Sequence, residues 1–446
     1  MAGDVDEEAP LTPGPFHSLR VAGRVLRAEG ARAVRDRALD RLAEERRRRS
    51  FTGSALPALS IPVLNLATAA PAARLGGVQG QLLHRVEAES ALRPLALLYP
   101  EGGSHRLEVL AGGSRHALQL GGGFESAVET AAGSTGARAL HVEGLAGLPM
   151  GSLLALRRQG LRLILSLHDF SPFCPRPHLL EHPVLRFCHY SRDMDRCGFC
   201  LRQDWPVDGD WQAERRELAA ELLAEADSLV FPSEFLRRTY RGLFPALDPG
   251  RQHVIEPAAA WEPVPPRPAP AVPVRHVALV GGVQVHKGAL VIEELVRRLA
   301  DRPDLRWSAY GGGDATILER LRRLPRMNVR GYYRSGSLPS LLRRGRVDLA
   351  LLLSIVPETY SLVLTECQAA GVPVLAFDLG APGDRLRAEG GGLLAPPESG
   401  AEGVAALLRD FLENRAAIPP LPTPPESNAR RVAETWLRLY RDLGLT

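Results

Sequence analysis

The chain has 446 residues, of which 45% are hydrophobic and 24% are charged, a composition typical of a globular protein with about two or three domains. It excludes a chain that is mainly disordered, collagen-like or held by a disulfide scaffold. No apolar run approaches the ~18 residues that span a bilayer, and the acidic first residues lack the pattern of a secretory signal. We therefore expect a cytoplasmic protein. The net charge of +4 is too small to indicate a nucleic-acid partner.

Residues 1–57 form an N-terminal extension, in which an acidic tail precedes a basic helical segment at 16–49. Val34, Ala38 and Leu42 make a stripe at i, i+4 and i+8, the spacing of one helix face. Two interpretations stay open. The segment is either a solvated helix packed on the body of the protein or a peripheral contact with a membrane surface, since basic amphipathic helices favour anionic lipid.

From about residue 60, short apolar strands alternate with helical patterns, as expected for βαβ units and a parallel sheet. We predict a first domain at 58–258, with strands at 61–68, 94–99, 138–142, 162–167 and 228–231 and helices at 81–89, 124–131, 147–159 and 212–226. Residues 259–274 are dense in proline, which excludes a helix or a central strand. They are predicted to be an inter-domain linker.

A second series of the same kind predicts another domain at 275–418, followed by a final helix within 426–446. Its strands are expected at 276–282, 305–311, 327–331, 347–353 and 372–378, and its helices at 288–300, 314–324, 337–344, 361–370 and 402–414. The predicted fold class is α/β, with two Rossmann-like, doubly wound parallel-sheet domains. Such domains bind ligands at the carboxyl ends of their strands, so we expect a cleft site between the two.

The strongest chemical signal is the pair Glu358 and Glu366, eight residues apart. A helix predicted to begin near Ser361 places the first carboxylate in a loop and the second inside the helix. The free backbone N–H groups at the helix start favour an anion. Acceptors for hydroxyls and donors for phosphate in one segment suit a nucleotide-sugar.

A second signal is GGVQVHKGA at 281–289, a turn between a strand and a helix. It contains Lys287, the single lysine of the chain. All the remaining residues among the 55 lysines and arginines are arginines. A lysine at a helix start is a point charge for phosphate. We therefore favour a role for Lys287 in binding phosphate over an ordinary surface position.

Together, these motifs resemble those of the GT-B glycosyltransferases, specifically the retaining family 4, also called glycosyl transferases group 1. The resemblance implies that Glu366 holds the ribose hydroxyls, that Glu358 faces the donor sugar and that Lys287 contacts the diphosphate. It also implies a phosphate cradle built from the backbone of Tyr360, Ser361 and Leu362. Where the family usually has an arginine, this chain has Gly282, so His286 or an arginine from elsewhere would have to supply the second cation.

The first half contributes weaker signals. Gly76 and Gly77 follow the first strand and resemble the glycine loop of the family. His141 and His168 end two successive predicted strands and are expected to face the cleft, where a lone histidine is more often a packed side chain than a catalyst. The resemblance selects His168 as the histidine beside the donor sugar.

An insert at 170–205 contains four cysteines, which are Cys174, Cys188, Cys197 and Cys200. The final pair has the Cys-x2-Cys spacing of half a zinc site, and the insert resembles that of a subset of family 4. Reduced thiols packed in a loop are the alternative in a cytosolic protein.

We therefore expect a retaining glycosyltransferase that moves a sugar from a nucleoside-diphosphate donor to a glycan or lipid-linked acceptor in polysaccharide or glycoconjugate assembly. No catalytic metal is expected, because Asp208-Gly209-Asp210 has no strand before it. One alternative is a GT-B-type sugar-nucleotide epimerase or hydrolase. The other is a donor-binding pseudoenzyme without turnover.

Overall fold

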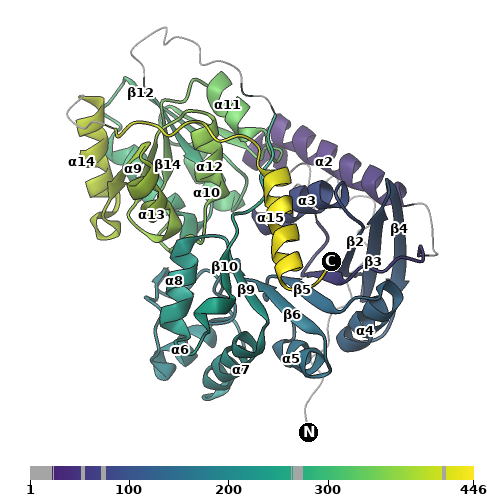
Figure 1. Cartoon of the computed structure of the whole chain (residues 1–446). Coiled ribbons are helices and arrows are strands. Elements are labelled where there is room, and N and C mark those ends of the chain that lie inside the picture. Colours follow the sequence, from purple (N-terminus) through teal and green to yellow (C-terminus); the bar gives the residue numbers. More distant parts are fainter. Residues whose placement is uncertain are drawn as a thin grey trace.

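The computed structural model describes residues 23, 25–51, 56–71, 77–262, 264, 275–413 and 418–446. Two large β-sheets, each covered by helices on both faces, form two domains side by side (Figure 1). The predicted α/β organisation with two parallel-sheet domains is confirmed. Much of the predicted linker and the acidic tail lie outside the described residues. None of the described helices combines the length and apolar character needed to cross a membrane.

The first sheet has the strand order β10-β9-β6-β5-β1-β2-β3-β4. Its strands up to β2 are parallel, whereas β3 and β4 add an antiparallel hairpin at the edge. The sequence did not predict this hairpin. The strands are β1 (Val63–Ala67), β2 (Leu95–Glu101), β3 (Ser104–Ala111), β4 (Ser114–Leu120), β5 (Ala139–Glu143), β6 (Arg162–Ser166), β9 (Ser228–Phe231) and β10 (Gln252–Val254).

The second sheet is parallel throughout, in the order β13-β12-β11-β14-β15-β16. Its central strands are almost fully buried, as both faces carry helices. The last strand was not predicted. The strands are β11 (Arg275–Val280), β12 (Leu305–Tyr310), β13 (Met327–Gly331), β14 (Leu349–Leu352), β15 (Val374–Phe377) and β16 (Gly392–Ala395).

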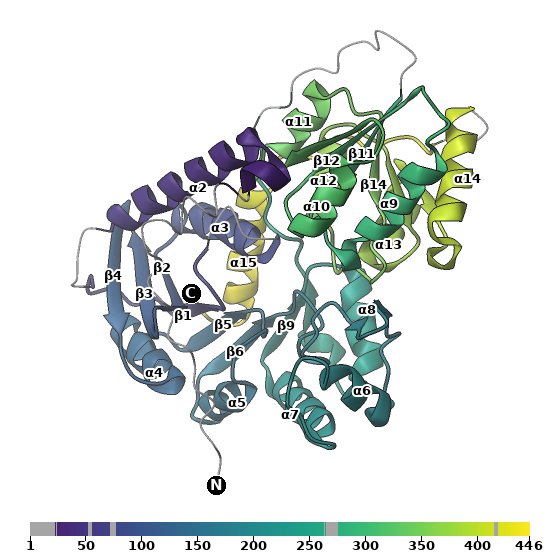
Figure 2. The ribbon, with the colours of Figure 1, turned by 180° about the vertical axis from the view of Figure 1, so that it is seen from behind.

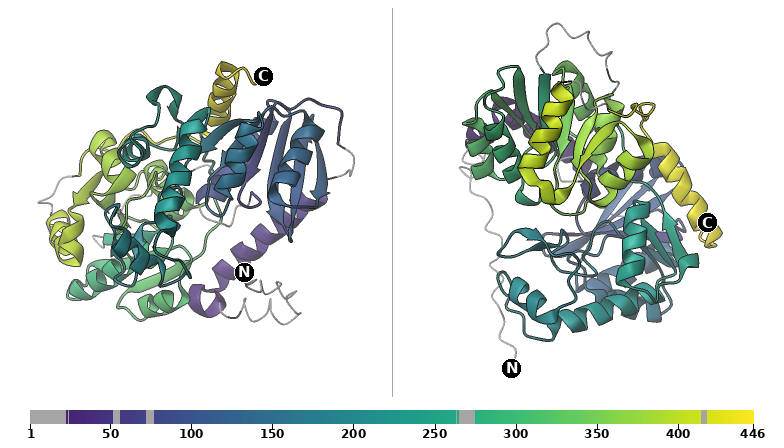
Figure 3. Two further views of the ribbon diagram at one scale, coloured as in Figure 1. Left: turned by 90° about the horizontal axis from the view of Figure 1, so that it is seen from below. Right: turned by 90° about the vertical axis from the view of Figure 1, so that its left-hand side faces the viewer.

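Helices cover both faces of each sheet (Figure 3). Those of the first domain are α3 (Gly77–Ser90), α4 (Phe124–Thr135), α5 (Met150–Arg158), α7 (Trp211–Glu225) and α8 (Glu234–Leu243). Those of the second are α9 (Ala289–Arg298), α10 (Ala315–Arg322), α11 (Leu338–Arg344), α12 (Leu362–Ala369), α13 (Gly380–Glu389) and α14 (Gly400–Leu412). The insert contains β7 (Leu180–Glu181), β8 (Arg186–Phe187) and α6 (Met194–Leu201).

The last helix, α15 (Ala429–Asp442), returns from the second domain and packs on the first sheet beside α3 (Figure 1). Its buried Trp436 and Tyr440 lie among side chains of β1, β5, β6 and β9. Because the chain has to cross between the domains to reach this position, the two domains are joined by more than one connection.

The N-terminal helix α2 (Ala31–Arg49) runs from the edge of the second domain, beside β13, to the edge strands of the first sheet (Figure 2). Its buried face does not consist of the predicted apolar stripe, because Ala38 and Leu42 are exposed. Asp36 and Asp40 are buried instead, where arginine side chains pair with them. The two acids can be buried on this face because ion pairs with arginine satisfy them.

Candidate active site

A cavity of about 770 Å³ lies between the two sheets, at the carboxyl ends of strands from both domains. It lies in the predicted cleft. Every predicted donor-site residue that the structure describes lines it, namely Gly77, His168, Gly282, Lys287, Glu358, Tyr360, Ser361, Leu362 and Glu366. Gly76 lies outside the described residues.

Lys287 ends the short 3-10 helix Val285–Lys287 directly before α9. Its Nζ lies 3.1 Å from Oε1 of Glu358, and a third of its side chain (33%) stays exposed. The turn depends on Gly288, which has φ +78°, because a Cβ there would lie 1.8 Å from the carbonyl oxygen of Leu353. The lysine is thus fixed at the cavity wall with room for an anion.

The loop that carries Glu358 is held from behind by α13. The backbone N–H of Ala381 donates to the carbonyl of Glu358 at 2.8 Å. A Cβ at Gly380 would lie 2.6 Å from the backbone nitrogen of Glu358, so this close approach requires glycine. Arg385 donates to the backbone carbonyls of Tyr360 and Ser361 at 3.4 and 3.3 Å. Sequence reasoning did not find Arg385, which holds this loop in place.

Helix α12 begins at the cavity. Its N-cap residue Ser361 has φ +71°, and its buried Oγ has no hydrogen-bond partner among the described residues. One turn further, burial raises the pKa of Glu366 to about 8. Burial and the nearby Glu366 also raise the pKa of Tyr333. The helix therefore presents hydrogen-bond donors for an anion at its start and a carboxyl acceptor just beyond.

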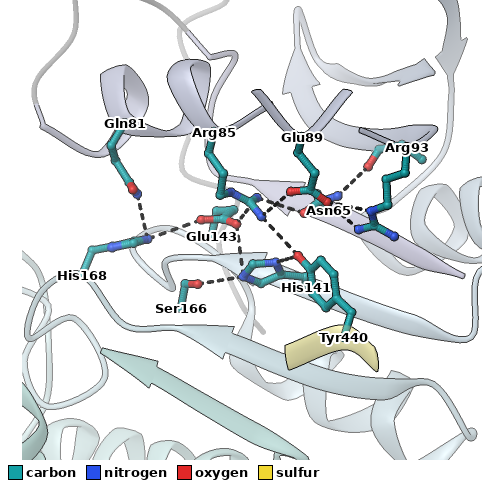
Figure 4. Close-up of polar contacts among 11 residues, drawn as sticks. Asn65, Gln81, Arg85, Glu89, Arg93, His141, Glu143, Ser166, His168 and Tyr440 are labelled. Atoms are coloured by element: carbon teal, nitrogen blue, oxygen red, sulfur yellow. Dashed lines mark hydrogen bonds and ion pairs between the residues drawn. The ribbon is translucent and has the colours of Figure 1, made fainter. Parts of the chain in front are cut away.

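On the opposite wall, His168 follows β6 and is anchored by two side chains (Figure 4). Its Nε2 lies 3.3 Å from Nε2 of Gln81 and 3.4 Å from Oε2 of Glu143. A protonated Nε2 donates to Glu143, whereas an unprotonated one accepts from the Gln81 amide. Both neutral tautomers thus find a partner.

Behind His168, a buried network connects the wall to α15 (Figure 4). Glu143 is ion-paired with Arg85, which also bonds Tyr440 and Glu89, each at 3.1 Å. Burial alone would raise the pKa of Glu143, but the charge of Arg85 more than offsets it and holds that pKa well below its usual range. The carboxylate is therefore ionised at neutral pH.

His141 belongs to this network and does not line the cleft, so its predicted exposure to the cleft was wrong. It is fully buried, with Nδ1 2.6 Å from the Tyr440 hydroxyl and Nε2 2.7 Å from Oγ of Ser166. Burial lowers the pKa of His141 to about 3, so it is neutral. It acts as a packed, hydrogen-bonded core residue.

The two walls meet at Thr359, the residue after Glu358. Its hydroxyl donates to the backbone carbonyl of His168 at 2.7 Å, and its carbonyl accepts from the Ser233 hydroxyl at 2.5 Å. Ser233 also caps α8 by accepting from Leu236. These bonds bring the histidine of one domain and the carboxylate of the other to the same end of the cavity.

A pair of histidines closes the cavity beside Lys287. The rings of His178, from the insert, and His286 stack with centroids 4.2 Å apart. Burial, His178 and Lys287 together lower the pKa of His286 to about 3. His286 is therefore neutral at physiological pH and does not supply the second cation that the sequence left open.

The four cysteines of the insert line a separate, apolar cavity of about 20 Å³ together with Phe173 and Leu179. All are free thiols, and burial raises the pKa of Cys174 to about 12. Within the described ranges, no group of three or more His, Cys, Asp and Glu side chains is arranged to hold a metal ion. Structural zinc at Cys174, Cys188, Cys197 and Cys200 stays a prediction, which metal analysis would test.

Among the other residues that line the main cavity are Arg37, Gln81 and Tyr332, which sequence reasoning did not select, and His178, which it considered only as a zinc ligand. They come from α2, α3, the insert and the end of β13. None lies in a motif with a readable spacing, so only the folded chain shows that they share one site.

Comparisons with known proteins agree with this geometry. Residues 274–414, which contain the whole second sheet, match the model of the family described as "Glycosyl transferases group 1". No curated protein matches the chain by sequence.

Solved structures match most of the chain. Sucrose-phosphate synthase from Thermosynechococcus elongatus is 17% identical, with 85% of this chain and 98% of that chain covered and a TM-score of 0.58. HepE from Anabaena, in complex with UDP and glucose, is 14% identical, with 86% and 98% covered and a TM-score of 0.52. The catalytic domain of starch synthase IV from Arabidopsis thaliana, bound to ADP and acarbose, is 11% identical, with the same coverage and the same TM-score.

At these identities the structural likeness shows the fold alone, which is the two-domain GT-B architecture. Together with the family match over the second domain, it defines the class of protein. The chain is a glycosyltransferase, as the sequence predicted.

Proposed function

We propose that the protein is a retaining, family 4 glycosyltransferase that moves a sugar from a nucleoside-diphosphate sugar to an acceptor hydroxyl. The observation that carries this proposal is the single cavity that gathers Lys287, Glu358, Glu366 and His168 from two domains. Solved relatives of the same fold are described with UDP and glucose or with ADP, which supports a nucleotide as the ligand of this cavity.

Each part of the donor has a chemical counterpart in the cavity. The Glu366 carboxyl suits the ribose hydroxyls, and Lys287 with the start of α12 suits the diphosphate. Glu358 and His168 flank the space left for the sugar. Because Lys287 is already 3.1 Å from Glu358, a diphosphate would compete with that carboxylate for the lysine.

In the proposed reaction, the bond between the anomeric carbon and the diphosphate oxygen breaks, and the acceptor oxygen bonds to that carbon on the same face. The acceptor proton passes to the departing diphosphate. Negative charge that builds on the diphosphate is met by Lys287 and by the free N–H groups at Ser361–Leu362, which are fixed before the reaction begins. This electrostatic support is the basis for expecting turnover without a catalytic metal.

The acceptor is proposed to be a glycan or a lipid-linked glycan at a membrane surface. The outer face of α2 supports this, because Leu39 and Leu42 are 42% and 51% exposed and Arg35 and Arg46 on the same helix are also exposed. Apolar side chains flanked by arginines suit an anionic lipid surface.

The test is turnover of UDP-, ADP-, GDP- and dTDP-glucose by the full-length chain with a sugar-alcohol or glycan acceptor, followed by NMR of the product. A glycoside that keeps the anomeric configuration of the donor supports the proposal. Free sugar, an isomerised donor or an inverted glycoside would contradict it.

A further inference from the structure

The N-terminal extension reaches the same cleft. The first half of α2 and Glu29 just before it lie on the edge strand β13 of the second sheet. The Tyr332 hydroxyl donates to Asp40 at 2.6 Å, and Arg334 donates to the same carboxylate at 3.0 Å. The backbone N–H of Tyr332 donates to Glu29 at 2.8 Å. These contacts fix one face of α2 against the end of β13.

Arg37 projects from that face and forms part of the cavity wall. Its guanidinium carbon lies 4.6 Å from the centroid of the Tyr332 ring, and its Nη2 lies 2.5 Å from Glu29. A Cβ at Gly312 would be only 2.8 Å from the same Nη2. The turn after β12 runs directly beside the guanidinium, and this close approach is possible because Gly312 has no side chain.

The Arg37 side chain is not fully engaged by these contacts. It stays 35% exposed, and its buried Nε has no hydrogen-bond partner among the described residues. A planar guanidinium that stays partly exposed at a cavity wall is well suited to bind an anion or a carbonyl oxygen.

The charge balance of the cavity points the same way. A diphosphate carries at least two negative charges, and Lys287 supplies one cation that Glu358 already partly neutralises. Gly282 supplies none, and His286 is neutral because its pKa is lowered to about 3. Among the described residues that line the cavity, Arg37 is the one arginine or lysine besides Lys287.

We propose that Arg37 is a donor-binding residue, whose guanidinium binds the nucleotide part of the nucleoside-diphosphate sugar, so that α2 completes the donor site from outside both sheet domains. This inference rests on the proposed function, in which the cleft binds such a donor. It assigns a substrate contact to a helix outside residues 274–414, the part that matches the glycosyltransferase family.

The experiment is calorimetric titration of UDP, ADP, GDP and dTDP into the full-length chain and its variants. For the nucleotide that the wild type binds, Arg37→Ala should raise the dissociation constant about 10- to 100-fold, the range for one lost hydrogen bond to a charged group. Arg37→Lys should recover part of the loss. The matched control is Arg41→Ala, which removes the same charge from an exposed position one turn further along α2 and should leave binding unchanged.

A second variant separates contact with the nucleotide from a structural role. If Arg37 acts only by holding α2 through Glu29, Glu29→Gln should weaken binding as much as Arg37→Ala. The proposal instead expects Glu29→Gln to bind the nucleotide at least as tightly as the wild type, because it removes the carboxylate that competes for the guanidinium.

The outcomes are distinguishable. Nucleotide affinity within twofold of the wild type in Arg37→Ala, or an equal loss in Glu29→Gln, would overturn the role of Arg37 and leave the proposed function standing. A wild-type chain that binds none of the four nucleotides would overturn both. Repeating the titration with the matching nucleoside tells whether the contact is to phosphate or to base and ribose, and either result supports the assignment.

Discussion

The two walls of the cleft are built in different ways. On the wall of the second domain, Lys287, Glu358 and Ser361 sit at turns held by close backbone approaches at Gly288 and Gly380, and their polar atoms have few protein partners. On the wall of the first domain, a buried chain of charged and polar groups stands behind His168 and continues to α15.

The difference indicates a division of tasks. A wall with few internal partners has hydrogen-bond capacity left for a ligand, which fits donor binding. A wall built on buried groups that mostly bond to one another has little capacity left but a fixed geometry. We infer that the second domain supplies binding and that the first holds His168 in place, with α15 as part of its support.

The largest effect is expected from breaking the buried network. Glu143→Gln should lower the free energy of unfolding by about 3–5 kcal/mol, because Arg85 and its other neighbours lose a buried counter-charge. Because the pKa of Glu143 is lowered in the folded protein, its ion pairs contribute to stability at every pH above the ordinary pKa of a glutamate. That contribution is lost as the pH falls from this ordinary pKa towards the lowered one. Urea unfolding at pH 7 measures the loss.

The matched control is Glu87→Gln, an exposed carboxylate on the same helix α3, which should change stability by less than about 0.5 kcal/mol. If Glu143→Gln were no more destabilising than this control, the first wall would not depend on its buried charges.

On the binding wall, Lys287→Ala should reduce turnover by about 10²–10³, the usual cost of removing one preorganised donor to developing charge. Stability should change little, because the lysine is partly exposed. Lys287→Arg keeps the charge and should retain part of the rate. A fully active Lys287→Ala enzyme would place the diphosphate elsewhere in the cleft.

A smaller effect concerns the pH dependence of nucleotide binding. Because the pKa of Glu366 is raised to about 8, the folded protein keeps a proton that the unfolded chain releases above about pH 4.5. If the ionised carboxylate accepts the ribose hydroxyls, nucleotide affinity should rise about tenfold between pH 7 and pH 9. Calorimetry at several pH values tests this, and Glu366→Gln should bind with no such dependence. An equal slope in that variant would assign the titration to another group.

The binding wall could be predicted from the sequence, whereas the network that supports His168 on the other wall could not. Lys287, Glu358 and Glu366 lie at strand and helix ends within one stretch of chain, where spacing alone brings them to one edge of a sheet. The bonds of His168 join residues far apart in sequence, such as Gln81, which is 87 positions away. No local pattern records such a pairing.

The N-terminal helix shows the same limit. Its apolar stripe does not mark the inner face, where Asp40 is buried because Arg334 and Tyr332, almost 300 positions away, satisfy it. Likewise, Arg37 shares no motif with Gly312, which it approaches only in the folded chain. Hydrophobic periodicity cannot identify a helix face that is stabilised by ion pairs.

The most direct test of the account is a thermal-shift measurement of the full-length chain with UDP, ADP, GDP and dTDP, alone and linked to glucose. A nucleotide at 100 times its dissociation constant adds roughly 2.7 kcal/mol to the stability of the protein that binds it. We predict a clear upward shift with at least one nucleotide, and its loss in Lys287→Ala. No shift with any of them, or an equal shift in Lys287→Ala, would contradict the assignment of the donor site.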